Sequence, residues 1–73
     1  MAITVSAHIT GTVWKINVKV GDTVAEGDTV AILESMKMEM PVESPAAGKV
    51  SAVLAKEGAP IEEGAPLLQL SEP

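Results

Sequence analysis

Apolar residues along the chain fall into short runs that glycine and proline interrupt. Residues 12–18 alternate imperfectly between apolar and polar side chains, and residues 29–33 are nearly all apolar. Residues 48–54 and 66–70 are short, mainly apolar runs of the same kind. Runs of this length, rich in β-branched side chains and separated by turn residues every ~8–12 positions, are typical of an all-β sandwich or barrel. The six glycines and five prolines leave little space for a long helix. The pattern therefore predicts short strands along the chain.

The two halves of the chain repeat each other at a constant offset of 37 positions, without a gap. Three glycines of each half coincide, and the apolar positions between them match. From Gly11 onward, the identical pairs are Gly11/Gly48, Val13/Val50, Lys19/Lys56, Gly21/Gly58, Glu26/Glu63, Gly27/Gly64 and Leu33/Leu70. Two copies are fewer than the roughly three that a solenoid needs. We therefore expect a flattened antiparallel β-barrel whose two sheets are related by a pseudo-twofold axis.

The link between the two copies, residues 34–40, gives conflicting signals. The Leu, Glu, Met and Lys residues in and beside the link are strong helix formers. Met36, Met38 and Met40, however, recur with a period of two, which predicts a half-buried strand with Lys37 facing outward. Because apolar flanks favour strands, we predict two strands joined by a tight hairpin at Met36 and Lys37. A two-residue hairpin loop prefers Asn-Gly. Met36 and Lys37 are poor turn formers, which indicates that something other than folding selected them.

A twofold relation between the copies also makes a prediction about the whole molecule. We expect the link to lie near the axis and the two chain ends to meet at the opposite end. Lys37, at the midpoint of the chain, would then lie alone at one pole.

Length and composition narrow the range of functions. A chain of 73 residues predicts one domain, residues 1–73, with no room for both a core and a deep substrate cleft. The absence of cysteine excludes disulfides and thiolate metal sites. The net charge of −5 and the single aromatic residue, Trp14, argue against a nucleic-acid partner. No run approaches the ~20 apolar residues of a membrane span, and no secretory signal pattern is present. We therefore expect no membrane partner and a cytoplasmic location.

The link also resembles a known modification site. The sequence Glu34-Ser35-Met36-Lys37-Met38 is similar to the Glu-Ala-Met-Lys-Met site of the biotinyl domains of biotin-dependent carboxylases. The surrounding repeat, from Ile9 to Ser71, resembles the biotinyl/lipoyl attachment family, in particular its short stand-alone attachment proteins and the biotin carboxyl carrier domains that lack a protruding thumb. This resemblance implies a barrel-sandwich hybrid of two four-stranded sheets.

The resemblance also implies a function. Lys37 matches the acceptor lysine that carries biotin covalently, and Met36 and Met38 match the flanking methionines that distinguish biotin acceptors from lipoyl acceptors. It implies a non-catalytic, monomeric carrier that is a substrate of biotin protein ligase. Such a carrier shuttles carboxyl groups between biotin carboxylase and carboxyltransferase subunits, with biotin as its cofactor.

Two alternatives remain open. One is a lipoyl carrier on the same fold, with lipoate on Lys37. The other is a Cu(I)-binding protein, because Met36, Met38 and Met40 offer three thioethers, which suit a soft metal. Side chains on one face of a strand repeat every ~6.8 Å, so the strand would have to distort to bring all three to one ion. The methionines could also simply pack the hairpin, and we expect Trp14 to be partly buried in a strand and His8 to lie on the surface.

Overall fold

The apolar runs of the sequence form eight strands. The computed structural model describes residues 2–72, none of which is helical, and the end residues of the predicted domain, Met1 and Pro73, lie outside the described residues. The strands are β1 (Ile3–Ser6), β2 (Gly11–Ile16), β3 (Thr23–Val24), β4 (Thr29–Ser35), β5 (Met38–Glu43), β6 (Gly48–Val53), β7 (Pro60–Ile61) and β8 (Pro66–Ser71). The predicted all-β fold is confirmed, and the link between the copies forms strand and turn rather than helix.

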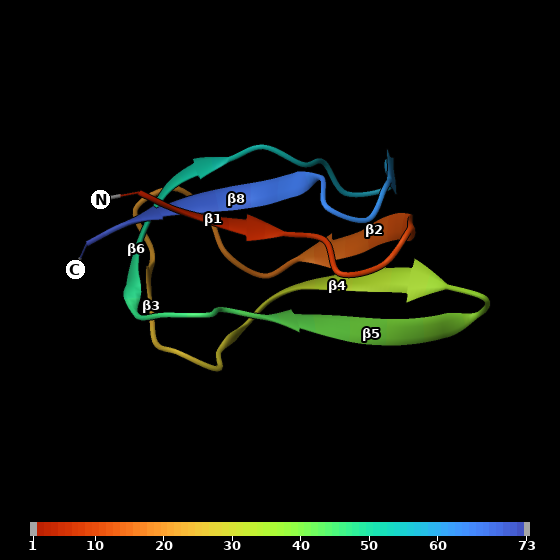
Figure 1. Cartoon of the computed structure of the whole chain (residues 1–73), viewed down its shortest axis with the longest axis horizontal. Helices are drawn as coiled ribbons and strands as arrows, with labels where there is room; N and C mark the ends of the chain where they lie inside the picture. The colour runs from red at the N-terminus through yellow and green to blue at the C-terminus, as the bar shows by residue number, and fades with distance from the viewer. Residues whose placement is uncertain (1, 73) are drawn as a thin grey trace.

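The strands make two four-stranded antiparallel sheets that enclose one apolar core. One sheet has the order β1-β8-β6-β3 and the other has the order β5-β4-β2-β7. The molecule is elongated, with extents of 35 × 18 × 17 Å. Figure 1 shows the β4–β5 hairpin projecting at one end of the long axis and both ends of the chain at the other.

The two sheets are related by the same offset that relates the two halves of the sequence. Adding four to each strand number, and counting on from β1 after β8, converts the order β1-β8-β6-β3 into the order β5-β4-β2-β7. The β-bulges coincide as well, because the register shift between Val13 and Lys15 in β2 has its counterpart between Val50 and Ala52 in β6. The predicted pseudo-twofold relation is therefore confirmed down to local irregularities of the strands.

Each half also closes on the other through its glycine turns. The N–H of Gly21 donates to the carbonyl of Val50 at 2.9 Å, and the N–H of Gly58 donates to the carbonyl of Val13 at 2.6 Å. These glycines have φ angles of 99° and 84°, a region that glycine occupies without steric cost. The repeated glycines therefore hold the two halves together reciprocally.

Two shallow grooves show where the pseudo-twofold axis crosses the surface, because each is lined by four residues and their counterparts 37 positions later. The groove between β1 and β5 has a volume of about 430 Å³ and is lined by Thr4, Val5, Ser6 and His8 with Pro41, Val42, Glu43 and Pro45. The other groove, about 470 Å³, is lined by Ile16, Val18, Lys19 and Val20 with Val53, Ala55, Lys56 and Glu57. The axis thus crosses the middle of the molecule and exchanges the hairpin tip with the chain ends. The expectation that the link lies near the axis is wrong, whereas its placement at the pole opposite the chain ends is confirmed.

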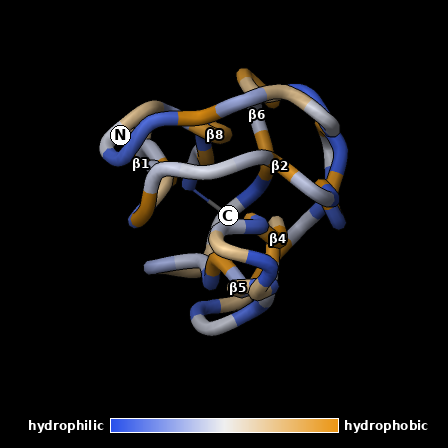
Figure 2. Tube along the Cα trace, turned by 90° about the vertical axis from the view of Figure 1, so that its right-hand side faces the viewer, coloured by the Kyte–Doolittle hydropathy of each residue, from blue (hydrophilic) through white to orange (hydrophobic). Residues whose placement is uncertain are grey.

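The core is built from pairs of equivalent residues. The buried pairs, each member at most 4% exposed, are Val5/Val42, Val13/Val50, Val30/Leu67, Ala31/Leu68 and Leu33/Leu70. Figure 2 shows apolar and polar stretches following one another along the tube. Trp14 lies in β2, as predicted, but at 47% exposure it is an exposed side chain rather than a partly buried one. The core is therefore aliphatic.

Candidate functional site

The predicted hairpin exists, and its turn has an uncommon backbone conformation. Ser35 pairs with Met38, which leaves Met36 and Lys37 as a two-residue loop with φ angles of 54° and 64°. Positive φ at both central residues is the signature of a type I′ turn, which Asn-Gly normally occupies. Among residues 2–72, these two are the only residues other than glycine with positive φ. Because each such residue costs on the order of 1–3 kcal/mol, the turn is strained at the two positions that the sequence singled out.

The base of the hairpin depends on a glycine in the neighbouring strand. A Cβ atom on Gly11 of β2 would collide with the carbonyl oxygen of Glu34 and would lie 3.2 Å from the Cβ of Ser35. Glycine at this position therefore lets β2 support β4 up to the residue pair beside the turn. The two-residue turn is therefore carried by a β4–β5 hairpin that β2 supports almost to its end.

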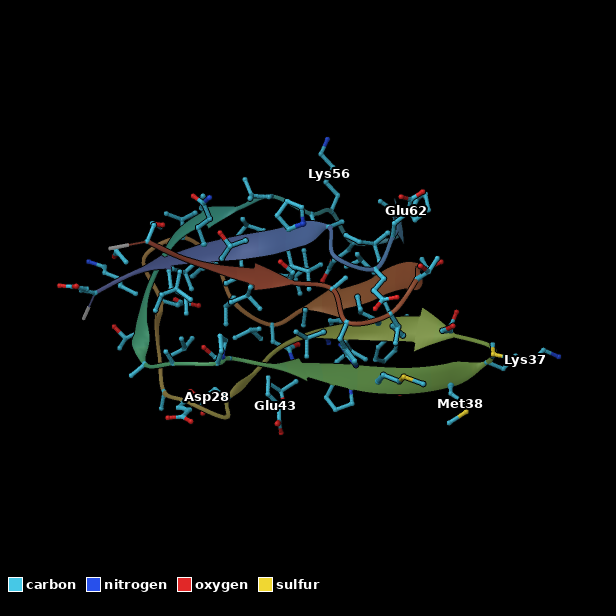
Figure 3. All side chains as sticks on the ribbon, in the orientation of Figure 1. Asp28, Lys37, Met38, Glu43, Lys56 and Glu62 are labelled. Atoms are coloured by element: carbon cyan, nitrogen blue, oxygen red, sulfur yellow. The ribbon has the colours of Figure 1, made fainter. Side chains whose placement is uncertain are left out.

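Lys37 lies at the extreme end of the molecule. Its side chain extends away from both strands in Figure 3, it is exposed, and no hydrogen bond or ion pair engages its amine within residues 2–72. Exposure alone does not distinguish it, because Lys15, Lys19, Lys49 and Lys56 are exposed as well. What distinguishes Lys37 is its position in a strained turn at a pole of the fold.

The two methionines beside Lys37 have little or no packing role. Met36 is 91% exposed and Met38 is 58% exposed, whereas Met40 is half-buried and Val42 is 4% exposed. Burial along this face of β5 thus begins only at Met40, because the hairpin tip projects beyond the other sheet. The predicted half-burial of this face is wrong at Met36 and Met38, while the predicted place of Met36 in the turn is confirmed. Both methionines surround Lys37 with accessible apolar surface.

A pair of acidic residues beside the turn was missed by the sequence reasoning. Glu34 and Glu39 lie directly opposite each other in the β4–β5 ladder, and both are exposed. Like charges in directly opposed positions destabilise a hairpin. Counting outward from a turn centred between Met36 and Lys37 would have paired these two glutamates, so the signal was present once the turn was placed.

The other residues considered in the sequence do not join this site. His8 is exposed, as predicted, and lines the groove between β1 and β5. Residues 2–72 contain no group of three or more His, Cys, Asp or Glu residues that could hold a metal ion, and no helix among them has the length and apolarity that a membrane span requires. The three thioethers are divided between the turn and β5, where Met38 and Met40 lie about 6.8 Å apart, which does not favour one shared ion.

The tip fits a covalently attached arm such as biotin. Neither groove is lined by a residue of the turn, so neither would enclose a group attached there. An amide link to a lysine needs only an accessible amine, which Lys37 provides. The arrangement thus suits presentation of an attached group to another protein.

Comparisons with known proteins identify the family of the chain. A family described as "Biotin-requiring enzyme" matches residues 1–70. The chain is 49% identical over 69 residues to the biotin/lipoyl attachment protein of Bacillus subtilis, covering 94% of each chain. It is 39% identical over 66 residues to the mitochondrial methylcrotonoyl-CoA carboxylase subunit alpha of Mus musculus, covering 90% of this chain but 9% of that subunit.

Solved structures agree with this match. The crystal structure of the Kluyveromyces lactis urea carboxylase superposes with a TM-score of 0.90 at 38% identity, over 97% of this chain and 6% of that one. The chain thus spans nearly all of a short attachment protein and a small part of the large carboxylases. It belongs to the biotinyl/lipoyl attachment family, whose members include the biotinyl domains of biotin-dependent carboxylases.

Proposed function

We propose that the protein is a carrier that bears biotin on Lys37 and is itself non-catalytic. The observation that carries the proposal is the placement of Lys37 in a strained two-residue turn at the pole of the molecule. A fold under selection for stability alone would place asparagine and glycine there. The backbone strain at Met36 and Lys37 is explained if the amine of Lys37 must project away from the rest of the domain.

A carrier of this kind works by tethering. The lysine stem adds four flexible carbon atoms to the attached group, and biotin, once attached, supplies the chemistry of holding a carboxyl group. Tethering raises the effective concentration of a group at a nearby active site, to the order of millimolar for short flexible linkers. The scaffold needs only to present the arm and to dock.

The residues around Lys37 have separate roles in this proposal. Met36 and Met38 offer exposed apolar surface to biotin protein ligase, which acylates the amine of Lys37. The net charge of −5 and the opposed pair of Glu34 and Glu39 favour docking on basic surfaces. We assign biotin carboxylase and carboxyltransferase subunits as the further partners, between which a cytoplasmic, monomeric carrier moves carboxyl groups.

Lipoate is the second candidate for the attached group, because the Bacillus subtilis relative is named for both biotin and lipoyl attachment. The two differ in mass, so an intact mass spectrum of the protein purified from its own host distinguishes them. A biotinyl adduct supports the proposal. A lipoyl adduct, or no adduct, contradicts it.

A labelling experiment locates the site. Purified protein is incubated with biotin protein ligase, ATP and biotin, and the mass gained is followed for the wild type, Lys37→Arg and Lys56→Arg. We expect one biotin per chain in the wild type and in Lys56→Arg, and none in Lys37→Arg, because arginine keeps the charge but lacks a nucleophilic amine. Labelling of Lys37→Arg would overturn the assignment. Lys56 serves as the control because it is also an exposed lysine.

A further inference from the structure

Within residues 2–72, the sulfur atoms gather at the hairpin tip. The chain has no cysteine and four methionines. The three methionines within residues 2–72 are Met36, Met38 and Met40, and each lies within three positions of Lys37. Thioethers are the sulfur groups that mild oxidants convert to sulfoxides, so the thioethers of residues 2–72 surround the candidate attachment site.

Burial ranks these three thioethers clearly. Met36 is 91% exposed in the turn and Met38 is 58% exposed at the start of β5, whereas Met40 is half-buried opposite the buried Leu33. Susceptibility to oxidation follows exposure. An oxidant in solution therefore reaches Met36 first, Met38 second and Met40 last, and the first two reactions disturb little of the core.

We propose that Met36 and Met38 form an oxidation site that controls attachment of the prosthetic group to Lys37. This inference rests on the function proposed above. In each reaction a hydrogen peroxide molecule transfers one oxygen to the thioether sulfur. The O–O bond breaks and an S–O bond forms. The sulfur is oxidised by two electrons, and the remaining oxygen leaves as water once it takes up the proton of the transferred oxygen.

The consequence for attachment follows from polarity. A sulfoxide is a polar, chiral group in place of a flexible apolar one, and both positions adjoin the amine that the ligase must reach. A ligase that reads apolar surface on either side of Lys37 loses that contact in the oxidised protein. The loss of apolar contacts in a recognition site is worth on the order of tenfold in specificity for each small group. Methionine sulfoxide reductases reverse the change, so the site is switchable.

The experiment uses the whole chain. The protein is treated with hydrogen peroxide, the reaction is quenched, and peptide mass spectrometry measures the oxygen added at each methionine and at Trp14. The initial rate of biotin transfer is then measured with purified biotin protein ligase, ATP and biotin. We expect sulfoxide at Met36 and Met38 before Met40. The kcat/KM of the ligase should fall by about tenfold with one of the two oxidised and by about a hundredfold with both, and it should recover after reduction by methionine sulfoxide reductases. Circular dichroism before and after oxidation checks that the fold is retained.

Matched variants assign the effect to the two positions. In the double variant Met36→Leu with Met38→Leu, the ratio of the oxidised to the unoxidised rate should stay near one, whatever its starting rate. In Met40→Leu the ratio should fall as in the wild type. An unchanged rate for the oxidised wild type, or the same fall in the double variant, overturns the inference while leaving the attachment site intact. Failure of the unoxidised wild type to accept biotin contradicts the proposed function instead.

Discussion

At the scale of single residues, the informative feature is a conflict between backbone and side chain. Met36 and Lys37 hold φ angles that favour glycine or asparagine. Neither residue gains burial in return, because Met36 is 91% exposed and Lys37 is also exposed. A local rule broken without a structural gain indicates a functional position.

Substituting Met36 with asparagine tests this conflict. Asparagine tolerates positive φ, so Met36→Asn should raise the free energy of unfolding by about 0.5–1 kcal/mol. Denaturant unfolding followed by circular dichroism measures the change. The control Met38→Asn lies in β5 and should lower stability, because asparagine is disfavoured in strands. A loss of stability in Met36→Asn would show that the Met36 side chain makes a stabilising contact.

At the scale of elements, the hairpin depends on the close approach of β2. The pseudo-twofold axis supplies a matched control for this contact, because Gly48 of β6 meets the carbonyl oxygen of Ser71 in the way that Gly11 meets that of Glu34. The two glycines serve the same packing purpose at opposite poles. Only Gly11 lies beside the tip.

Alanine substitutions at Gly11 and at Gly48 distinguish the effect of this packing on stability from its effect on the presentation of Lys37. A Cβ would lie 2.6 Å from the Ser71 oxygen in Gly48→Ala, and closer still to the Glu34 oxygen in Gly11→Ala. We expect both variants to lose on the order of 1–3 kcal/mol of stability through strand displacement. The rate of biotin transfer, measured on folded protein, should fall in Gly11→Ala and stay near wild type in Gly48→Ala. Equal rates in the two variants would show that the tilt of the hairpin does not affect the ligase.

The elements and the candidate attachment residue were predictable from sequence for different reasons. The glycine-marked repeat predicted two related sheets, since each copy keeps the same turns. The period of two predicted the hairpin, because poor turn formers at Met36 and Lys37 still lay between alternating strands. Exposure of Met38 and the opposition of Glu34 to Glu39 were not predicted. Both depend on how far the ribbon projects and on its register, which arise from tertiary packing and not from local pattern.

At the scale of the whole molecule, the pseudo-twofold axis makes an energetic prediction. Leu33 of β4 and Leu70 of β8 are equivalent residues, and both are 0% exposed. Leu33→Ala and Leu70→Ala should each lower the free energy of unfolding by about 2–5 kcal/mol, with values that agree to within ~1 kcal/mol because the surrounding core repeats. Chemical denaturation of both variants provides the comparison. A clear difference would mean that one half of the core relaxes around the cavity more completely than the other.

The opposition of the hairpin tip and the chain ends has a mechanical consequence for larger assemblies. β1 begins and β8 ends at one pole, so a flexible segment joined to either strand would be anchored at the far end from Lys37. The domain then acts as a stiff spacer, adding most of its 35 Å length between anchor and amine. Rotation about a single anchor point would sweep the amine over a spherical shell of nearly that radius, before any movement of the lysine side chain is counted. The reach of the attached group would therefore be set mainly by the length of the folded domain.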